Sequence, residues 1–130
     1  MNEQLKHDDI THKIIGCCMR VHTKLGNGFQ EVIYQRALEI EMTLEGISFE
    51  REKEMPIYYR DILIGTRRVD FFVENLIMVE LKALILLEDV HLTQGLNYLE
   101  AYNIEIGLLI NFGSQSLSFK RLLNKKFKPI

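Results

Sequence analysis

Residues 67–83 read RRVDFFVENLIMVELKA, and this stretch decides how the rest of the chain can be interpreted. Most of its residues are aromatic, aliphatic or β-branched, which favours two β-strands joined by a short turn at residues 74–75. Asp70, Glu80 and Lys82 interrupt that apolar pattern. Buried charges cost free energy unless they pair with one another, bind a metal or take part in chemistry. We therefore treat the predicted hairpin as the centre of a candidate functional site.

The composition of the 130-residue chain indicates a single globular domain over residues 1–130. The chain is 47% hydrophobic and 26% charged, and no apolar run approaches the ~20 residues that cross a membrane. Its polar, acidic start is unlike a signal or transit peptide, and the adjacent Cys17 and Cys18 close no useful loop for a disulfide. We expect a cytoplasmic protein with no membrane contact, a core at about residues 8–123 and a loose tail at 124–130.

The charge of the chain is unevenly distributed. The formal net charge is −2, which does not indicate a strongly cationic nucleic-acid binder. Near the C-terminus, however, there are five cations and no acid: Lys120, Arg121, Lys125, Lys126 and Lys128. Such a cluster could contact phosphates, but charge alone favours a solvated terminus.

Hydrophobic periodicity predicts an α/β fold. Helical spacing of apolar residues indicates helices at about residues 8–24, 30–44 and 90–102. Extended segments are predicted at residues 47–60, 105–111 and 116–123. Another begins at residue 62, is interrupted at residues 65–66 and is followed by the two strands of the hairpin. A helix between the second hairpin strand and residue 105 makes the strands on either side of it parallel neighbours. The sequence therefore predicts a mixed β-sheet flanked by helices.

The register of the hairpin decides whether the three charged side chains meet. Glu80 and Lys82 share one face of a strand because side chains alternate. Asp70 joins them only if paired residues across the hairpin have numbers with an even sum. A regular two-residue turn gives an odd sum, whereas a three-residue or bulged loop that pairs Phe72 with Leu76 gives an even one. We therefore predict an irregular turn at this point.

Two chemical interpretations fit Asp70, Glu80 and Lys82. Two carboxylates in one pocket repel unless a cation lies between them, and Mg²⁺ suits such oxygen ligands, with the Leu81 carbonyl as a further ligand. Lys82 could then orient the attacking water or stabilise charge that develops in the transition state. The alternative is a salt-bridge cluster on an exposed sheet face, and from these three residues alone that alternative is at least as good.

Three spaced motifs give the chain a resemblance to a known superfamily. Asp70, nine intervening residues and Glu80-Leu81-Lys82 resemble the Asp…(Asp/Glu)-x-Lys signature of the PD-(D/E)xK phosphodiesterases, with Val69 in place of the proline. Residues 94–98 resemble the Gln-x-x-x-Tyr motif of the RecB-like and lambda-exonuclease-like branches, through Gln94 and Tyr98. Gly28, Glu31 and Tyr34 match Gly-x-x-Glu-x-x-Tyr, the motif of the GxxExxY proteins, which resemble this superfamily.

This resemblance implies a fold, a cofactor and a set of roles. It implies a restriction-endonuclease-like αβββαβ core and a Mg²⁺ or Mn²⁺ ion held by Asp70 and Glu80. It implies that Lys82 is the catalytic lysine and that Glu31 helps to hold the metal or its water. Gln94 and Tyr98, at i and i+4 on one helix face, would reach the active site. Taken singly, each helix residue also has a structural interpretation: a first-turn acid, a core tyrosine at position 34 or a polar pair on a helix surface.

The residues and the resemblance together favour a metal-dependent nuclease whose partner is nucleic acid, with DNA preferred. The competing hypothesis is a non-enzymatic nucleic-acid-binding or assembly module that retains the fold, since the net charge is acidic. A homodimer is also possible, because the apolar Phe71-Phe72 pair and residues 84–87 could contribute to an interface.

Overall fold

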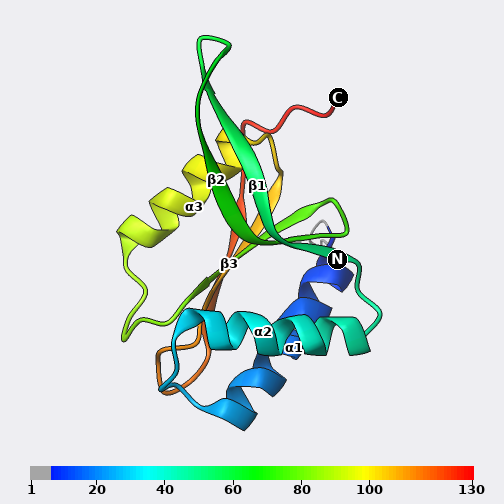
Figure 1. Cartoon of the computed structure of the whole chain (residues 1–130), viewed down its shortest axis with the longest axis vertical. Coiled ribbons are helices and arrows are strands. Elements are labelled where there is room, and N and C mark those ends of the chain that lie inside the picture. The colour runs from blue at the N-terminus through cyan, green and yellow to red at the C-terminus, as the bar shows by residue number, and fades with distance from the viewer. Residues whose placement is uncertain (1–6) are drawn as a thin grey trace, which may run out of the picture.

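A computed structural model describes residues 7–130 of the chain; the predicted domain's residues 1–6, including most of its polar start, lie outside the described part. The elements in order are α1 (Asp8–Leu25), α2 (Glu31–Leu44), β1 (Phe49–Tyr59), β2 (Ile62–Val73), β3 (Ile77–Lys82), α3 (Asp89–Ala101), β4 (Ile106–Asn111) and β5 (Ser118–Leu123). The strands form one sheet in the order β1-β2-β3-β4-β5, in which β3 and β4 are parallel and the other pairs are antiparallel. The predicted mixed sheet with flanking helices is confirmed (Figure 1).

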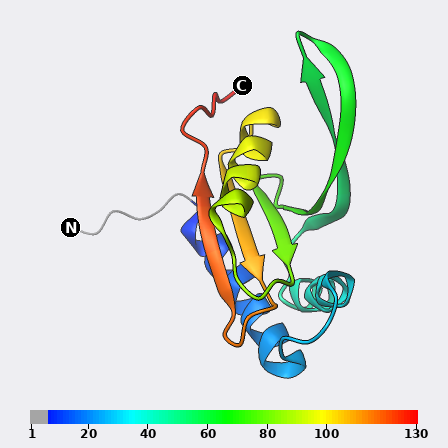
Figure 2. The same cartoon turned by 90° about the vertical axis from the view of Figure 1, so that its left-hand side faces the viewer.

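The helices divide the core into two layers, one on each face of the sheet (Figure 2). Helices α1 and α2 cover one face, where their apolar stripes pack on Phe71, Val79, Leu81 and other strand residues. Helix α3 covers the other face, where Leu99 packs near Met78 and Leu109, among others. Odd-numbered β3 residues therefore face α1 and α2, and even-numbered ones face α3, as the alternation of a strand requires.

Strands β1 and β2 form a long hairpin that projects from the body of the protein (Figures 1 and 2). The predicted interruption at residues 65–66 is wrong, because β2 continues through them. A shift of register between Ile57 and Tyr58 accommodates one extra residue of β2 instead. Pro56 lies on the edge strand β1, where the proline costs no ladder hydrogen bond to a second neighbour.

The turn between β2 and β3 is irregular, as predicted. The Leu76 amide donates to the Val73 carbonyl over 2.9 Å, and Glu74 and Asn75 both have left-handed backbones, with φ of 53° and 55°. The loop has three residues and Val73 pairs with Ile77, which gives the even sum that the shared site requires. The predicted pairing of Phe72 with Leu76 is wrong, because Phe72 pairs with Met78. The three-residue loop begins one residue later than predicted, at Glu74.

The C-terminal tail is tied to the body, so the prediction of a loose tail is wrong. The buried Asn124 side chain donates to the carbonyls of Leu99 and Ile104 at 3.1 and 3.0 Å. Further along, Asn103 and the backbone of Lys128 exchange two hydrogen bonds. Two asparagine side chains thus supply the partners that secondary structure would otherwise provide for this backbone.

Candidate active site

Glu80 is the most deeply buried acid of the site, with 5% of its surface exposed, on the face of β3 that α3 covers. The guanidinium of Arg67, on β2, donates to its Oε1 over 2.6 Å. Burial, followed by the negative charge of Asp70, raises the pKa of Glu80 to about 8, and Arg67 opposes this rise only in part. A carboxyl with such a high pKa lies where a second cation or a proton is favoured.

Asp70 lies where β2 leaves β3, because the pairing of these strands ends at Phe71 and Val79. On β2, Val69 packs in the layer under α3, whereas Phe71 packs in the layer under α1 and α2. The side chain between them therefore lies at the boundary of the two layers. There it accepts hydrogen bonds from the Gln35 side chain at 3.0 Å and the Leu81 amide at 2.8 Å. The same carboxyl is close enough to Glu80 to raise its pKa.

Lys82 and the polar side of α3 complete the pocket around Glu80. Its lining residues come from β2, β3, β4 and α3: Arg67, Glu80, Lys82, His91, Gln94, Gly95, Tyr98 and Leu109. The Arg67 guanidinium lies 3.9 Å from the centre of the Tyr98 ring, so this tyrosine supports the cation that pairs with Glu80. The structure thus brings together five of the predicted residues: Asp70, Glu80, Lys82, Gln94 and Tyr98.

Glu31 does not join this group. It is the first residue of α2 and its side chain is exposed. Among residues 7–130, no three or more His, Cys, Asp or Glu side chains gather where one metal ion could bind them. One turn further along the same helix face, the buried Gln35 occupies the position against Asp70. Glu31 therefore completes no three-carboxylate group with Asp70 and Glu80, and its contact with the metal or its water stays a prediction.

The Gly28-to-Tyr34 motif has a structural role that the geometry makes plain. Tyr34 is fully buried and its hydroxyl donates to the Gly26 carbonyl over 2.6 Å and accepts from the Phe29 amide over 3.1 Å. Its ring stacks on Phe112, with 4.6 Å between the ring centres. The tyrosine therefore fixes the loop that contains Gly28 onto the start of α2, which positions the helix that presents Gln35.

The segment after Lys82 is held by residues 111–113, which follow β4. The buried Asn111 side chain accepts from the Leu84 amide over 2.8 Å and donates to the Leu84 carbonyl over 2.9 Å. The Phe112 amide donates to the Lys82 carbonyl over 2.8 Å. Gly113 lies so close that a Cβ there would fall 2.3 Å from the Leu84 nitrogen. This clamp fixes the backbone that carries the lysine.

The family model of the PD-(D/E)XK nuclease superfamily matches residues 8–122. The chain belongs to this superfamily. The predicted signature residues from Asp70 to Lys82 therefore lie within a nuclease-type fold, and nucleases of this superfamily generally use divalent metals.

Comparison with solved structures supports the same fold. The crystal structure of SSO0001 matches with a TM-score of 0.52 at 17% sequence identity. The match covers 85% of this chain and 65% of SSO0001, so the chain spans somewhat less than two thirds of that protein. The predicted restriction-endonuclease-like core is thereby confirmed as a fold. A search of curated proteins finds no match.

The carboxylates present fit a divalent ion of the kind that PD-(D/E)XK nucleases use. Asp70 and Glu80 come from adjacent strands, and their mutual repulsion would be relieved by a cation between them. Mg²⁺ is commonly held by one or two protein carboxylates while waters and substrate phosphates complete its shell. Leu81, predicted to offer its carbonyl, contributes its amide to Asp70 in this conformation.

Two residues of the site, Gln35 and Arg67, were not predicted from the sequence. Gln35 follows Glu31 by four positions, so a helix-face argument applied to the motif could have found it. In a regular strand, Arg67 and Asp70 would point to opposite faces, because they are three residues apart. It reaches Glu80 because the orientation of β2 changes between Val69 and Phe71, and no local sequence signal predicts that change.

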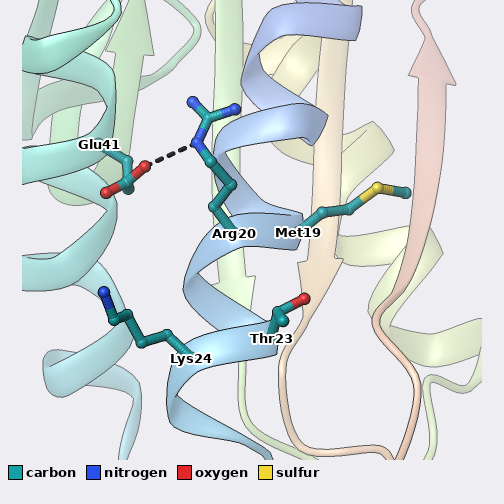
Figure 3. A pocket seen from close by; sticks show the side chains of 5 residues that line it. All are labelled: Met19, Arg20, Thr23, Lys24 and Glu41. Carbon is teal, nitrogen blue, oxygen red and sulfur yellow. Dashed lines mark hydrogen bonds and ion pairs between the residues drawn. The ribbon is translucent and has the colours of Figure 1, made fainter.

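A second hollow lies between α1 and α2, away from these residues (Figure 3). It has a volume of about 510 Å³ and is lined by Met19, Arg20, Thr23, Lys24 and Glu41. Arg20 and Glu41 pair across it at 2.7 Å. Its open shape and surface ion pair are those of a groove between two packed helices.

No helix in the described part of the chain is long and apolar enough to span a membrane.

Proposed function

We propose that this protein is a Mg²⁺- or Mn²⁺-dependent nuclease that hydrolyses phosphodiester bonds of DNA. The observation that carries the proposal is the convergence of Asp70 and Glu80 beside Lys82, in a chain of the PD-(D/E)XK nuclease superfamily. We further propose that it belongs to the GxxExxY group and is cytoplasmic. The motif formed by Gly28, Glu31 and Tyr34 and the Gln-x-x-x-Tyr spacing support the first of these assignments.

In this proposal, Asp70, Glu80 and the Leu81 carbonyl would hold the ion, whose chemistry there would be to lower the pKa of a bound water. Lys82 shares the pocket with Glu80, so its ammonium can orient that water and stabilise charge on the attacked phosphate. Gln94 and Tyr98, from α3, line the same pocket and can position the phosphate group. Lys82 is therefore assigned the role of catalytic lysine.

Glu31 and Gln35 are assigned to the α2 side of the site. Gln35 donates to Asp70 and leaves the other oxygen of that carboxylate to the Leu81 amide, which fixes its orientation. Glu31 lies four residues earlier on the same helix face, about 6 Å along the axis. Its exposed side chain is therefore proposed to hold water bound to the metal, not to bind the metal directly.

The deciding experiment is a cleavage assay on duplex DNA, single-stranded DNA and RNA with Mg²⁺, Mn²⁺ or EDTA. We expect cleavage of DNA that requires the metal and falls at least about 100-fold in Lys82→Ala, the size of a general acid–base or electrostatic contribution. Lys13→Ala is the matched control, because that lysine is exposed on α1 and its loss changes net charge equally. Equal cleavage by wild type and Lys82→Ala, or none by either, would reject the enzymatic proposal.

The alternative, a non-enzymatic module that binds nucleic acid or assembles with a partner, is favoured by one specific observation. Arg67 already pairs with Glu80, as it would in a site that has no metal. Calorimetric titration with Mn²⁺ separates the nuclease from the non-enzymatic module. The nuclease proposal requires Mn²⁺ binding that Asp70→Asn weakens, whereas a permanent Arg67–Glu80 ion pair predicts no Mn²⁺ binding.

Nucleic acid is the proposed partner, and the basic tail offers a place for its phosphates. Tail residues Lys125, Lys126 and Lys128 are exposed, although Lys126 lies 3.6 Å from Glu100. A homodimer also remains a proposal, but Phe71 cannot contribute because it is fully buried in the core. Sedimentation velocity with Leu86→Ser, a residue with 70% of its surface exposed, tests whether residues 84–87 form the interface.

A further inference from the structure

Arg67 makes the contact with Glu80 that the proposed mechanism gives to a metal ion. Its guanidinium bonds Glu80 at 2.6 Å and its own strand's Arg68 carbonyl at 2.9 Å, and it rests on the Tyr98 ring. About a quarter of its side chain is exposed, whereas only 6% of the Glu80 side chain is. The arginine therefore covers a buried carboxylate from the solvent side.

The pocket has no room for a hydrated ion in this conformation. Its free volume is about 10 Å³, about what a single water molecule requires. Mg²⁺ gives up its waters reluctantly and keeps several of them when protein-bound. Something must move before the ion can enter, and among the cations that line this pocket only Arg67 bonds Glu80.

Arg67 also has the chemistry of a phosphate ligand. Guanidinium groups bind phosphate oxygens through paired N–H donors and remain charged at every relevant pH. Arg67 lies beside Lys82, Gln94 and His91, which with it make the pocket rich in donors. A nucleic-acid phosphate that enters this pocket would therefore compete with Glu80 for the guanidinium.

We propose that Arg67 is an exchangeable cation: it pairs with Glu80 in the free protein and transfers to a substrate phosphate when nucleic acid binds, which frees Glu80 for the metal. This inference rests on the proposed nuclease function. Metal and nucleic acid then bind cooperatively, and by linkage each tightens the other by the same factor. Tyr98 supports the guanidinium on Glu80, which assigns the tyrosine of the Gln-x-x-x-Tyr motif to positioning Arg67.

The first test is calorimetric titration of Mn²⁺ into the protein without nucleic acid, at pH 8.5, where protons compete less for Glu80. Arg67→Gln keeps an amide donor next to Glu80 but removes the competing charge. A hydrogen bond to a charged group contributes about 1.5–3 kcal/mol, so we expect Mn²⁺ to bind about 10- to 100-fold more tightly in this variant. Arg68→Gln, with the same loss of charge on an exposed neighbour, is the matched control and should match wild type within about twofold.

The second test measures the exchange itself, in a Lys82→Ala background that prevents cleavage. A 20-base-pair duplex should tighten Mn²⁺ binding about tenfold when Arg67 is present and by much less in Arg67→Gln/Lys82→Ala. Arg67→Lys, which retains the charge, should keep the wild-type Mn²⁺ affinity within a few-fold, and circular dichroism should report native folding for every variant.

The outcomes separate this inference from the proposed function. If wild type cleaves DNA and binds Mn²⁺ but Arg67→Gln binds it no more tightly, the exchange is rejected and the nuclease proposal stands. If neither wild type nor Arg67→Gln binds Mn²⁺, the nuclease proposal itself fails. Tighter Mn²⁺ binding in Arg68→Gln as well would reduce the effect to general charge and would also reject the exchange.

Discussion

Replacement of Glu80 by glutamine tests whether the carboxylates of the site oppose folding in the absence of metal. The pKa of Glu80 rises from its ordinary value of 4.5 to about 8 in the folded chain, mainly because of burial and then because of Asp70. The folded state therefore binds a proton more tightly than the unfolded state does. Stability is greatest below pH 4.5 with respect to this group, and it falls as the pH rises toward 8.

The magnitude follows from the size of the pKa change. Each pH unit between the two pKa values costs about 1.36 kcal/mol, so wild type loses up to ~5 kcal/mol between pH 4.5 and pH 8 through this group. Relaxation of the site lowers that figure. Glutamine cannot ionise, and its side-chain oxygen still accepts from Arg67. We therefore expect Glu80→Gln to match wild type at pH 5 and to exceed its free energy of unfolding by about 3 kcal/mol at pH 9.

The assay is urea denaturation in EDTA at several pH values between 5 and 9. Glu54→Gln is the matched control, because Glu54 is exposed on β1 and glutamine keeps the acceptor for the Thr66 hydroxyl. Mg²⁺ added at pH 8 should stabilise wild type and not Glu80→Gln. A difference between Glu80→Gln and wild type that does not change with pH would refute this prediction, because folding would then leave the proton affinity of Glu80 unchanged.

Two further substitutions test the supports of the site. Gly113→Ala would place a Cβ 2.3 Å from the Leu84 nitrogen, so we expect a loss of about 3 kcal/mol in urea denaturation, whereas Gly28→Ala, with no atom within 4 Å of its Cβ, should cost under about 1 kcal/mol. An equal loss in both variants would argue against the clamp. Tyr34→Phe removes the 2.6 Å hydrogen bond to the Gly26 carbonyl and should lower the free energy of unfolding by about 1–2 kcal/mol. An unchanged thermal midpoint would show that the ring stacking alone fixes that loop.

The predictable part of the fold is the part that local patterns control. Apolar spacing predicts the three helices and the five strands of the described residues to within a few residues, since helical stripes and extended apolar runs are local signals. Parity predicts the irregular turn at residues 74–76 because side chains in a strand alternate strictly and one face must be buried. Parity does not predict the exact pair, because several three-residue loops satisfy it.

The loose tail was a wrong prediction for a different reason. Basic, proline-containing sequence after residue 123 has little apolar surface with which to pack. The tail is fixed instead by side-chain amides that bond backbone groups, from Asn124 and from Asn103 some twenty residues earlier. Such long-range polar contacts leave no periodic signal, and only the three-dimensional arrangement reveals them.

The candidate site was predictable in its acids and lysine but not in the residues that hold them. Asp70, Glu80 and Lys82 stand out because charge in an apolar hairpin is unusual. Gln35 and Arg67 do not stand out, since glutamine in a helix and arginine in a strand are ordinary. Their roles arise where β2 leaves β3, a point at which the sheet splits and one aspartate faces both layers.

That split has a chemical consequence. In a flat sheet, Asp70 and Glu80 on one face would both lie under α3, and α2 could not reach either of them. Because β2 turns away at Asp70, this carboxylate is held from the α2 side by Gln35 while it still acts on Glu80, which Arg67 holds from the α3 side. Each carboxylate therefore has a separate hydrogen-bond partner on its own side of the sheet, while the negative charge of Asp70 raises the pKa of Glu80. A substitution in one layer, such as Gln35→Leu, should accordingly alter the binding of Mn²⁺ through Asp70 while it leaves the Arg67–Glu80 pair in place.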